Sequence, residues 1–155
     1  MANIIRQCRF LFPYNCVSNC KIGFINKFGD KLNLQINVKK ILEDKAPYQY
    51  AASKLINADS LLYIGRGLDY ALSMEGSLKL KEISYIHAEG YASGEMKHGP
   101  IALIDPHFPT FALALDDELF PKVKSNIQEV LARQGRVIAL VQEKDGKAPE
   151  LPVEE

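Results

Sequence analysis

The sequence predicts an α/β fold built on a parallel sheet. Apolar runs of strand length alternate with longer segments of helical character, and the first apolar run closes on a tight glycine turn. A strand–helix–strand–helix–strand order is typical of parallel strands joined by right-handed crossovers. We therefore expect an open α/β sandwich whose sheet has three strands, with no helix after the third strand, so that the sheet looks unfinished.

The expected elements begin with a helix. Ile36, Val38, Ile41 and Leu42 have helical spacing, Pro47 interrupts this helix, and residues 48–56 continue it. The next apolar run is continuous, as in a strand that is buried on both faces. It covers residues 61–64.

The second half of the chain repeats this alternation. Residues 68 to about 87 contain one glycine and no proline, and are expected to form a helix. Glycines then interrupt residues 90–100, where we expect turns and at most one helical turn. Residues 110–115 and 136–141 are the second and third expected strands. The helix between them tolerates Pro121 in its first turn and should end at Gly135 in a left-handed conformation.

Length and composition exclude several classes of protein. The chain has 155 residues, long enough for one domain, and its 19 basic and 19 acidic side chains give zero net charge. This balance offers no basic surface for a phosphate backbone, which argues against nucleic-acid binding. No apolar run approaches the roughly 20 residues that a membrane helix needs. The start of the chain also lacks the pattern of a signal peptide.

Residues 1–30 show no sustained hydrophobic period, unlike the rest of the chain, and are interpreted as a leader of unknown role. They hold all three cysteines, an odd number that argues against a disulfide framework and favours the reducing cytoplasm. Cys16 and Cys20 resemble two zinc ligands, but a closed zinc site needs four and no histidine lies nearby. We expect no metal and no cofactor.

The most informative segment is the helix expected around residues 70–85. At about 100° per residue, Glu75, Lys79 and Glu82 share a narrow arc. Apolar side chains flank this arc on both sides: Met74, Leu78 and Tyr85 on one, and Leu72, Leu80 and Ile83 on the other. A separate polar arc is expected to face solvent: Ser73, Ser77, Lys81 and Ser84.

A surface helix usually has one polar face, so a second charged arc between apolar ones needs an explanation. One hypothesis is that Glu75, Lys79 and Glu82 lie against a partly buried crevice and perform acid–base chemistry. The alternatives are ordinary surface ion pairs at i,i+3 and i,i+4 spacing, or an internal structural ion network.

Two further motifs are weaker candidates. Gly65, Arg66 and Gly67 follow a strand and open a helix, where ligands of open α/β sheets bind, although a tight turn explains them as well. His98 lies between glycines, where a titrating imidazole would be accessible. Its spacing from Glu95 matches half of a di-iron motif, but no second copy is present. His87 and His107 have no comparable context.

The segments 62–67, 75–89 and 94–104 closely resemble one family. They are similar to the second sugar isomerase (SIS) domain of glucosamine–fructose-6-phosphate aminotransferase (isomerizing). The resemblance is densest over residues 61–105, looser over 38–60 and through the helix near residue 134, and absent from the first 30 residues. It implies a flavodoxin-like, three-layer α/β/α fold with a mainly parallel sheet.

The resemblance also implies a reaction and its residues. The family converts fructose 6-phosphate and glutamine into glucosamine 6-phosphate and glutamate. By resemblance, Glu82 moves a proton between carbons 1 and 2 of the sugar, and Glu75 and Lys79 belong to the same catalytic cluster. His98 assists ring opening and reaches the active site of the partner subunit, which implies a homodimer formed through SIS domains.

Other parts of the family enzyme have no counterpart in the sequence. The chain shows no glutaminase domain, no first SIS domain and no C-terminal Schiff-base lysine. We therefore expect residues 31–155 to be a partial SIS domain, incomplete at its C-terminal end, which is inactive alone. The alternatives are a non-catalytic phosphosugar-binding module, or an interaction module that pairs with a full-length enzyme.

Overall fold

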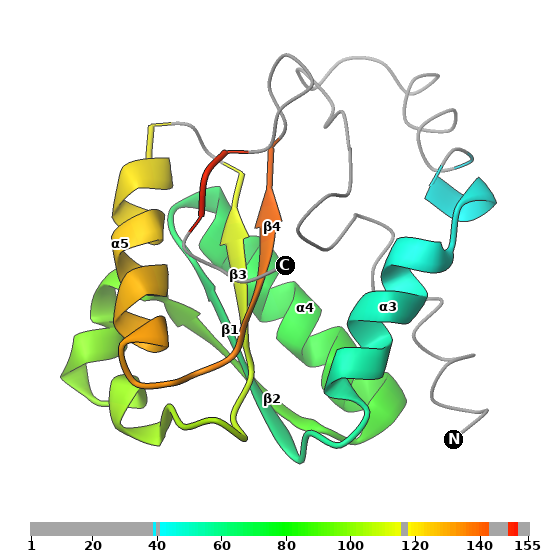
Figure 1. Ribbon diagram of the computed structural model, residues 1–155, viewed down its shortest axis with the longest axis horizontal. Helices are drawn as coiled ribbons and strands as arrows, with labels where there is room; N and C mark the ends of the chain where they lie inside the picture. The colour runs from blue at the N-terminus through cyan, green and yellow to red at the C-terminus, as the bar shows by residue number, and fades with distance from the viewer. Residues whose placement is uncertain (1–38, 40, 116–117, 143–148, 152–155) are drawn as a thin grey trace.

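A computed structural model describes residues 39, 41–115, 118–142 and 149–151. In this part of the chain four parallel strands form one sheet in the order β2-β1-β3-β4. Helices cover both faces of the sheet, so the molecule has three layers (Figure 1). The strands are β1 (Ser60–Gly65), β2 (His87–Ala92), β3 (Thr110–Ala114) and β4 (Val137–Val141).

Each face of the sheet carries its own hydrophobic core. On one face, helices α3 (Ala46–Leu55) and α4 (Leu68–Ser84) pack on a core that contains Tyr63 and Phe111, whose ring centroids lie 5.1 Å apart. On the other face, helix α5 (Phe120–Leu131) packs on the second core. The apolar strand residues alternate between these two cores, which explains why the strands read as continuous apolar runs.

The predicted α/β fold is confirmed, and β1, β3 and β4 coincide with the three expected strands. The interruption of the first helix is also present: residues 41–43 are helical, residues 44 and 45 are not, and α3 begins at Ala46. Pro47 occupies the first turn of α3 and does not end a helix, since that position needs no backbone donor.

The prediction of three strands is wrong, because β2 is a fourth strand. Helix α4 ends at Ser84, followed by Tyr85 in the left-handed conformation with φ 62°, and does not reach His87. The segment His87–Ala92 consists mainly of residues that are poor strand formers, which is why it read as a helix end and a turn. Ala88 is fully buried in the core that also contains Leu80 of α4.

The end of α5 also differs from the expectation. The left-handed residue is Gln134, with φ 62°, and not Gly135. Gly135 is required for space: a Cβ there would lie 2.5 Å from Ile104 Cγ2 and 2.7 Å from Val130 Cγ1. The glycine therefore permits close packing of the turn and does not supply backbone freedom.

Helix α4 approaches the sheet unusually closely. A Cβ on Gly65 would lie 2.5 Å from the backbone carbonyl of Asp69, and one on Gly90 would lie 2.9 Å from Met74 Cα. A Cβ on Gly76 would lie 3.0 Å from the Tyr63 ring. Glycines on the helix and on two strands therefore remove the side chains that would separate the two layers.

The same approach overturns the expectation that the serine arc of α4 faces solvent. Ser73 and Ser77 are buried, and only Lys81 in this arc is fully exposed. Their hydroxyls donate to carbonyls of their own helix, Ser73 to Asp69 O and Ser77 to Met74 O, both at 2.8 Å. Small hydroxyls that bond locally can be buried at little cost, so they suit a tight helix–sheet contact.

The substitution Gly65→Ala tests this contact. We expect it to lower the free energy of unfolding by about 1–3 kcal/mol, because the new methyl group meets backbone that cannot rotate away. Urea denaturation measures the loss. Ala71→Ser, which adds one atom at an exposed position of α4, is the matched control and should stay within about 0.5 kcal/mol. Equal stability of Gly65→Ala and the wild type would contradict the proposed close approach.

Candidate functional site

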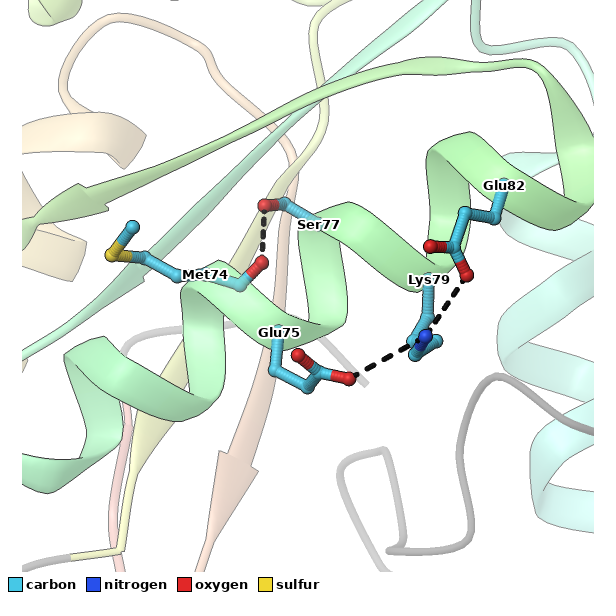
Figure 2. A network of polar contacts seen from close by, with 5 residues as sticks. All are labelled: Met74, Glu75, Ser77, Lys79 and Glu82. Atoms are coloured by element: carbon cyan, nitrogen blue, oxygen red, sulfur yellow. Dashed lines mark hydrogen bonds and ion pairs between the residues drawn. The ribbon is translucent and has the colours of Figure 1, made fainter.

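Helix α4 brings together the three charged residues that the sequence singled out. Lys79 Nζ lies 2.9 Å from Glu82 Oε2 and 3.6 Å from Glu75 Oε1 (Figure 2). The helical period places residues three and four positions apart on the same face, so the arrangement follows directly from the spacing. We call Glu75, Lys79 and Glu82 the charged triad.

The expectation that the triad lies in a partly buried crevice is wrong for this chain. The side chains of Glu75, Lys79 and Glu82 are 60%, 42% and 50% exposed. They face away from the sheet because the small residues of α4 occupy the inward face. The geometry of the triad therefore matches that of surface ion pairs, which was one of the alternatives.

The apolar residues beside the triad divide into two groups. Leu80 is buried and Ile83 half-buried, and both pack in the core under α4. The others are exposed on the same outer side as the triad: Leu68, Leu72, Met74, Leu78 and Tyr85. We call these five residues the outer apolar face of α4. An apolar face of this kind on an exposed helix usually marks an interaction site.

The charges within the triad act on Lys79. The hydrogen bond to Glu82, and then the Coulomb attraction of the same carboxylate, raise the pKa of the Lys79 ammonium above its ordinary value, with a smaller effect from Glu75. Lys79 therefore stays charged and donates to one oxygen of Glu82 (Figure 2). The other oxygen of Glu82 has no hydrogen bond to any described residue.

His98 lies at the end of a separate element, the 3-10 helix η1 (Ser93–His98). Its ring is 75% exposed, and its Nε2 lies 3.8 Å from Glu95 Oε2. No contact among the described residues joins His98 to the charged triad. The imidazole is thus exposed to solvent, as predicted, but it does not lie beside the charged triad.

The other two histidines have the ordinary environments that the sequence suggested. The His87 ring lies 3.2 Å from the carboxylate of Glu89. His107 lies on an exposed turn, where its backbone amide donates to Asp105 Oδ1. Among the residues that the structure describes, no three potential metal ligands cluster together. Cys16 and Cys20 lie outside the described residues.

The turn after β1 orders the start of α4. Gly67, with φ 56°, is the N-cap residue of α4, a left-handed position that favours glycine. The Arg66 side chain is half-buried, and its Nε donates to Asn126 Oδ1 at 3.5 Å. Gly65 makes room for the first turn of the helix. A substrate-binding role for these three residues stays a prediction.

Sequence reasoning missed a buried carboxylate beside this turn. Asp69 is 4% exposed, and its Oδ2 accepts a hydrogen bond of 2.8 Å from the backbone amide of Leu115. It therefore ties the first turn of α4 to the end of β3. An acidic residue in the first turn of a helix is a recognisable signal, but its partner here lies 46 residues away.

A row of polar side chains on β2 is a further feature that the sequence did not reveal. The hydrogen bond to Glu89, and then the charge of that carboxylate, raise the pKa of the Tyr91 hydroxyl. Glu89 also contacts the ring of His87. Alternate residues of a strand share one face, so the row became visible only once β2 was recognised as a strand.

The fold and the site together define an α/β domain with parallel strands, whose charged triad lies on the helix after β1. The chain belongs to the SIS domain family, which matches residues 54–152. No described helix is both long enough and apolar enough to cross a membrane.

Individual relatives are more specific. The chain is 52% identical over 103 residues to glutamine–fructose-6-phosphate aminotransferase (isomerizing) from Aquifex aeolicus, covering 66% of this chain and 17% of the relative. It is 62% identical over 93 residues to the enzyme of the same name from Zymomonas mobilis, covering 60% of this chain and 15% of the relative. The chain thus spans less than a fifth of these relatives.

A solved structure shares the fold. The C-terminal domain of glucosamine-fructose-6-phosphate aminotransferase from Francisella tularensis superposes with a TM-score of 0.55 and 37% identity. The match covers 70% of this chain and 38% of that one. The expected flavodoxin-like SIS fold is therefore confirmed.

The electrostatics of the triad can be tested by titration. We expect Glu82→Gln to lower the pKa of Lys79, and Glu75→Gln to lower it less, because Glu82 contributes the largest effects. NMR titration of the Lys79 side chain measures the pKa of each variant. Glu95→Gln, on η1, is the control and should leave it unchanged. A larger effect of Glu75→Gln than of Glu82→Gln would contradict the observed geometry.

Proposed function

We propose that this chain is a phosphosugar-isomerase domain, in which Glu82 transfers a proton between carbons 1 and 2 of fructose 6-phosphate. The observation that carries the proposal is the charged triad, in which Lys79 holds Glu82 by a hydrogen bond of 2.9 Å. Support comes from relatives that are about half identical in sequence and are named for an isomerizing reaction of fructose 6-phosphate.

The proton transfer follows from the geometry of the triad. In the open-chain ketose, the free oxygen of Glu82 takes a proton from carbon 1, and the electron pair forms the enediolate between carbons 1 and 2. The hydroxyl proton on oxygen 1 passes to oxygen 2 of the enediolate. The same carboxyl group then returns its proton to carbon 2, the electron pair on oxygen 1 forms the carbonyl at carbon 1, and the aldose results. Lys79 keeps the carboxylate oriented and Glu75 orients Lys79. His98, which by resemblance reaches the site of the second copy in a dimer, exchanges protons with the sugar during ring opening.

The reaction for which the relatives are named includes a step besides isomerization. The relatives' name describes amino transfer from glutamine to fructose 6-phosphate, and the chain covers under a fifth of their length. We propose that this chain contributes the isomerase step of glucosamine 6-phosphate formation, as part of amino sugar biosynthesis in the cytoplasm. The exposed triad alone is not a complete site.

A partner surface would complete the site. The outer apolar face of α4 borders the triad, and Leu68 and Tyr85 in it are 77% and 91% exposed. A surface laid on this face would bury the apolar side chains and take the triad out of bulk water, which strengthens its electrostatics. We propose that a second copy of the chain is this partner, so that two SIS domains form a homodimer.

A second candidate is a non-catalytic phosphosugar-binding module. The exposure of the triad favours it, because surface ion pairs at i,i+3 and i,i+4 spacing require no catalytic role. Such a module would recognise the sugar phosphate and have no preference for a reaction intermediate.

The two candidates are separated by an enediolate analogue. We expect a sugar-phosphate hydroxamate, which is planar and anionic like the enediolate, to bind at least about 100-fold more tightly than fructose 6-phosphate. Glu82→Gln should remove most of that preference and change fructose 6-phosphate binding little. Calorimetric titration of both ligands measures the ratio.

Glu150→Gln removes an exposed carboxylate outside the triad and is the matched control. Equal affinity for the two ligands would reject the catalytic proposal and favour the binding module. In a coupled assay, the chain alone should not interconvert fructose 6-phosphate and glucose 6-phosphate faster than Glu82→Gln does. Turnover that the variant loses would show that the site is already complete.

Self-association tests the homodimer. We expect the double variant Leu72→Ser, Leu78→Ser to raise the dimer dissociation constant at least about tenfold, because both leucines would be buried between the copies. Sedimentation equilibrium measures the constant. Leu103→Ser removes an exposed leucine from a different element, η2 (Pro100–Leu103), and should have no effect. A chain that stays monomeric at every concentration would exclude this partner.

A further inference from the structure

Element η1, which carries His98, is held to the rest of the chain at three points. Met96 is fully buried in the core under α5. Lys97 Nζ forms an ion pair of 2.9 Å with Glu129 Oε1 on α5. The third point is Gly94, which lies under the side chain of Arg66. His98 itself extends beyond these contacts into solvent.

The contact between Arg66 and Gly94 is a close packing of a flat side chain on bare backbone. A Cβ on Gly94 would lie 2.8 Å from Nη2 of Arg66, 3.1 Å from Cζ and 3.3 Å from Nη1. The guanidinium group therefore occupies the space that a Cβ at position 94 would need, and it would have to shift to admit one. Beyond Gly94, Nε of Arg66 reaches Asn126 on α5, which is 6% exposed.

Arg66 thus connects three elements from one position. Its backbone lies in the turn between β1 and α4, and its side chain contacts η1 and α5. A guanidinium group suits this task because it is planar and rigid, whereas the ammonium group of lysine is a point charge on a flexible stem. The contact gives a reason for an arginine at position 66 and for a glycine at position 94.

We propose that Arg66 is a positioning residue, which fixes η1 against α5 and so sets where His98 stands relative to the turn that starts α4. The proposal rests on the proposed function, which gives His98 its role in ring opening. It assigns Arg66 a structural task in the site in place of direct contact with the substrate.

The test uses Arg66→Met and Arg66→Lys in the full chain. We expect hydrogen exchange of the Met96–Gly99 amides to become about tenfold faster in Arg66→Met, because η1 loses one of its anchors. The imidazole resonances of His98 should shift and broaden. Arg66→Lys should behave like Arg66→Met, since lysine cannot cover Gly94. Arg133→Met removes an exposed arginine from the turn that follows α5 and is the control.

A double-mutant cycle tests the contact itself. Gly94→Ala should accelerate exchange in η1 about tenfold in the wild type, because the methyl group displaces the guanidinium group. In an Arg66→Ala background the space is free, so the same substitution should change exchange less than about twofold. Additive effects would overturn the proposal, as would unchanged His98 resonances in Arg66→Met.

These outcomes are independent of the proposed function. Exchange and imidazole resonances are measured without substrate, so they decide the role of Arg66 even if fructose 6-phosphate does not bind. Failure of binding in the wild type, with the expected changes in η1, would reject the function and leave the positioning contact. A global loss of stability with no change specific to η1 would overturn the positioning role.

Discussion

The close approach of α4 to the sheet is the constraint on which the rest of the structure depends. Gly65, Gly76 and Gly90 remove side chains at the points where helix and strands meet, and backbone atoms would lie within 3.0 Å of a Cβ at Gly65 and Gly90. Beside Leu80, small residues fill much of the inward face of α4, while Leu72, Met74 and Leu78 are exposed. The helix therefore departs from the usual distribution in which leucines are buried and hydroxyls exposed.

The consequence for function is that the charged triad and the outer apolar face of α4 share one surface. In the triad Lys79 lies between two carboxylates of the same helix, and all three side chains are exposed to water. Enzymes gain most from charged groups in sites that exclude water. Under the proposed function, this chain would supply the charged groups and their orientation, and a covering surface would supply the low dielectric environment.

Most of the fold could be predicted from the sequence, because β1, β3 and β4 are continuous apolar runs that can be recognised without knowledge of their neighbours. The fourth strand could not be predicted. Its small residues Ala88 and Gly90 pack against α4, and this contact with a distant helix leaves no strand pattern in the local sequence. In the candidate site, the triad could be predicted because helical spacing is local. The burial of Ser73 and the exposure of Leu72 could not, since helical period alone does not say which arc meets the sheet.

The sequence by itself determined which residues lie together on α4, because three- and four-residue spacing on a helix places side chains on one face whatever surrounds them. It also determined the order of strands and helices along the chain apart from β2, through the alternation of apolar runs and helical segments. Only the tertiary structure decided which face of α4 turns inward and how the distant residues join: Asp69 with the Leu115 amide, and Arg66 with Gly94 and Asn126. These contacts connect segments far apart in the chain, so no local period encodes them, and they exist only once the sheet has brought the strand ends together.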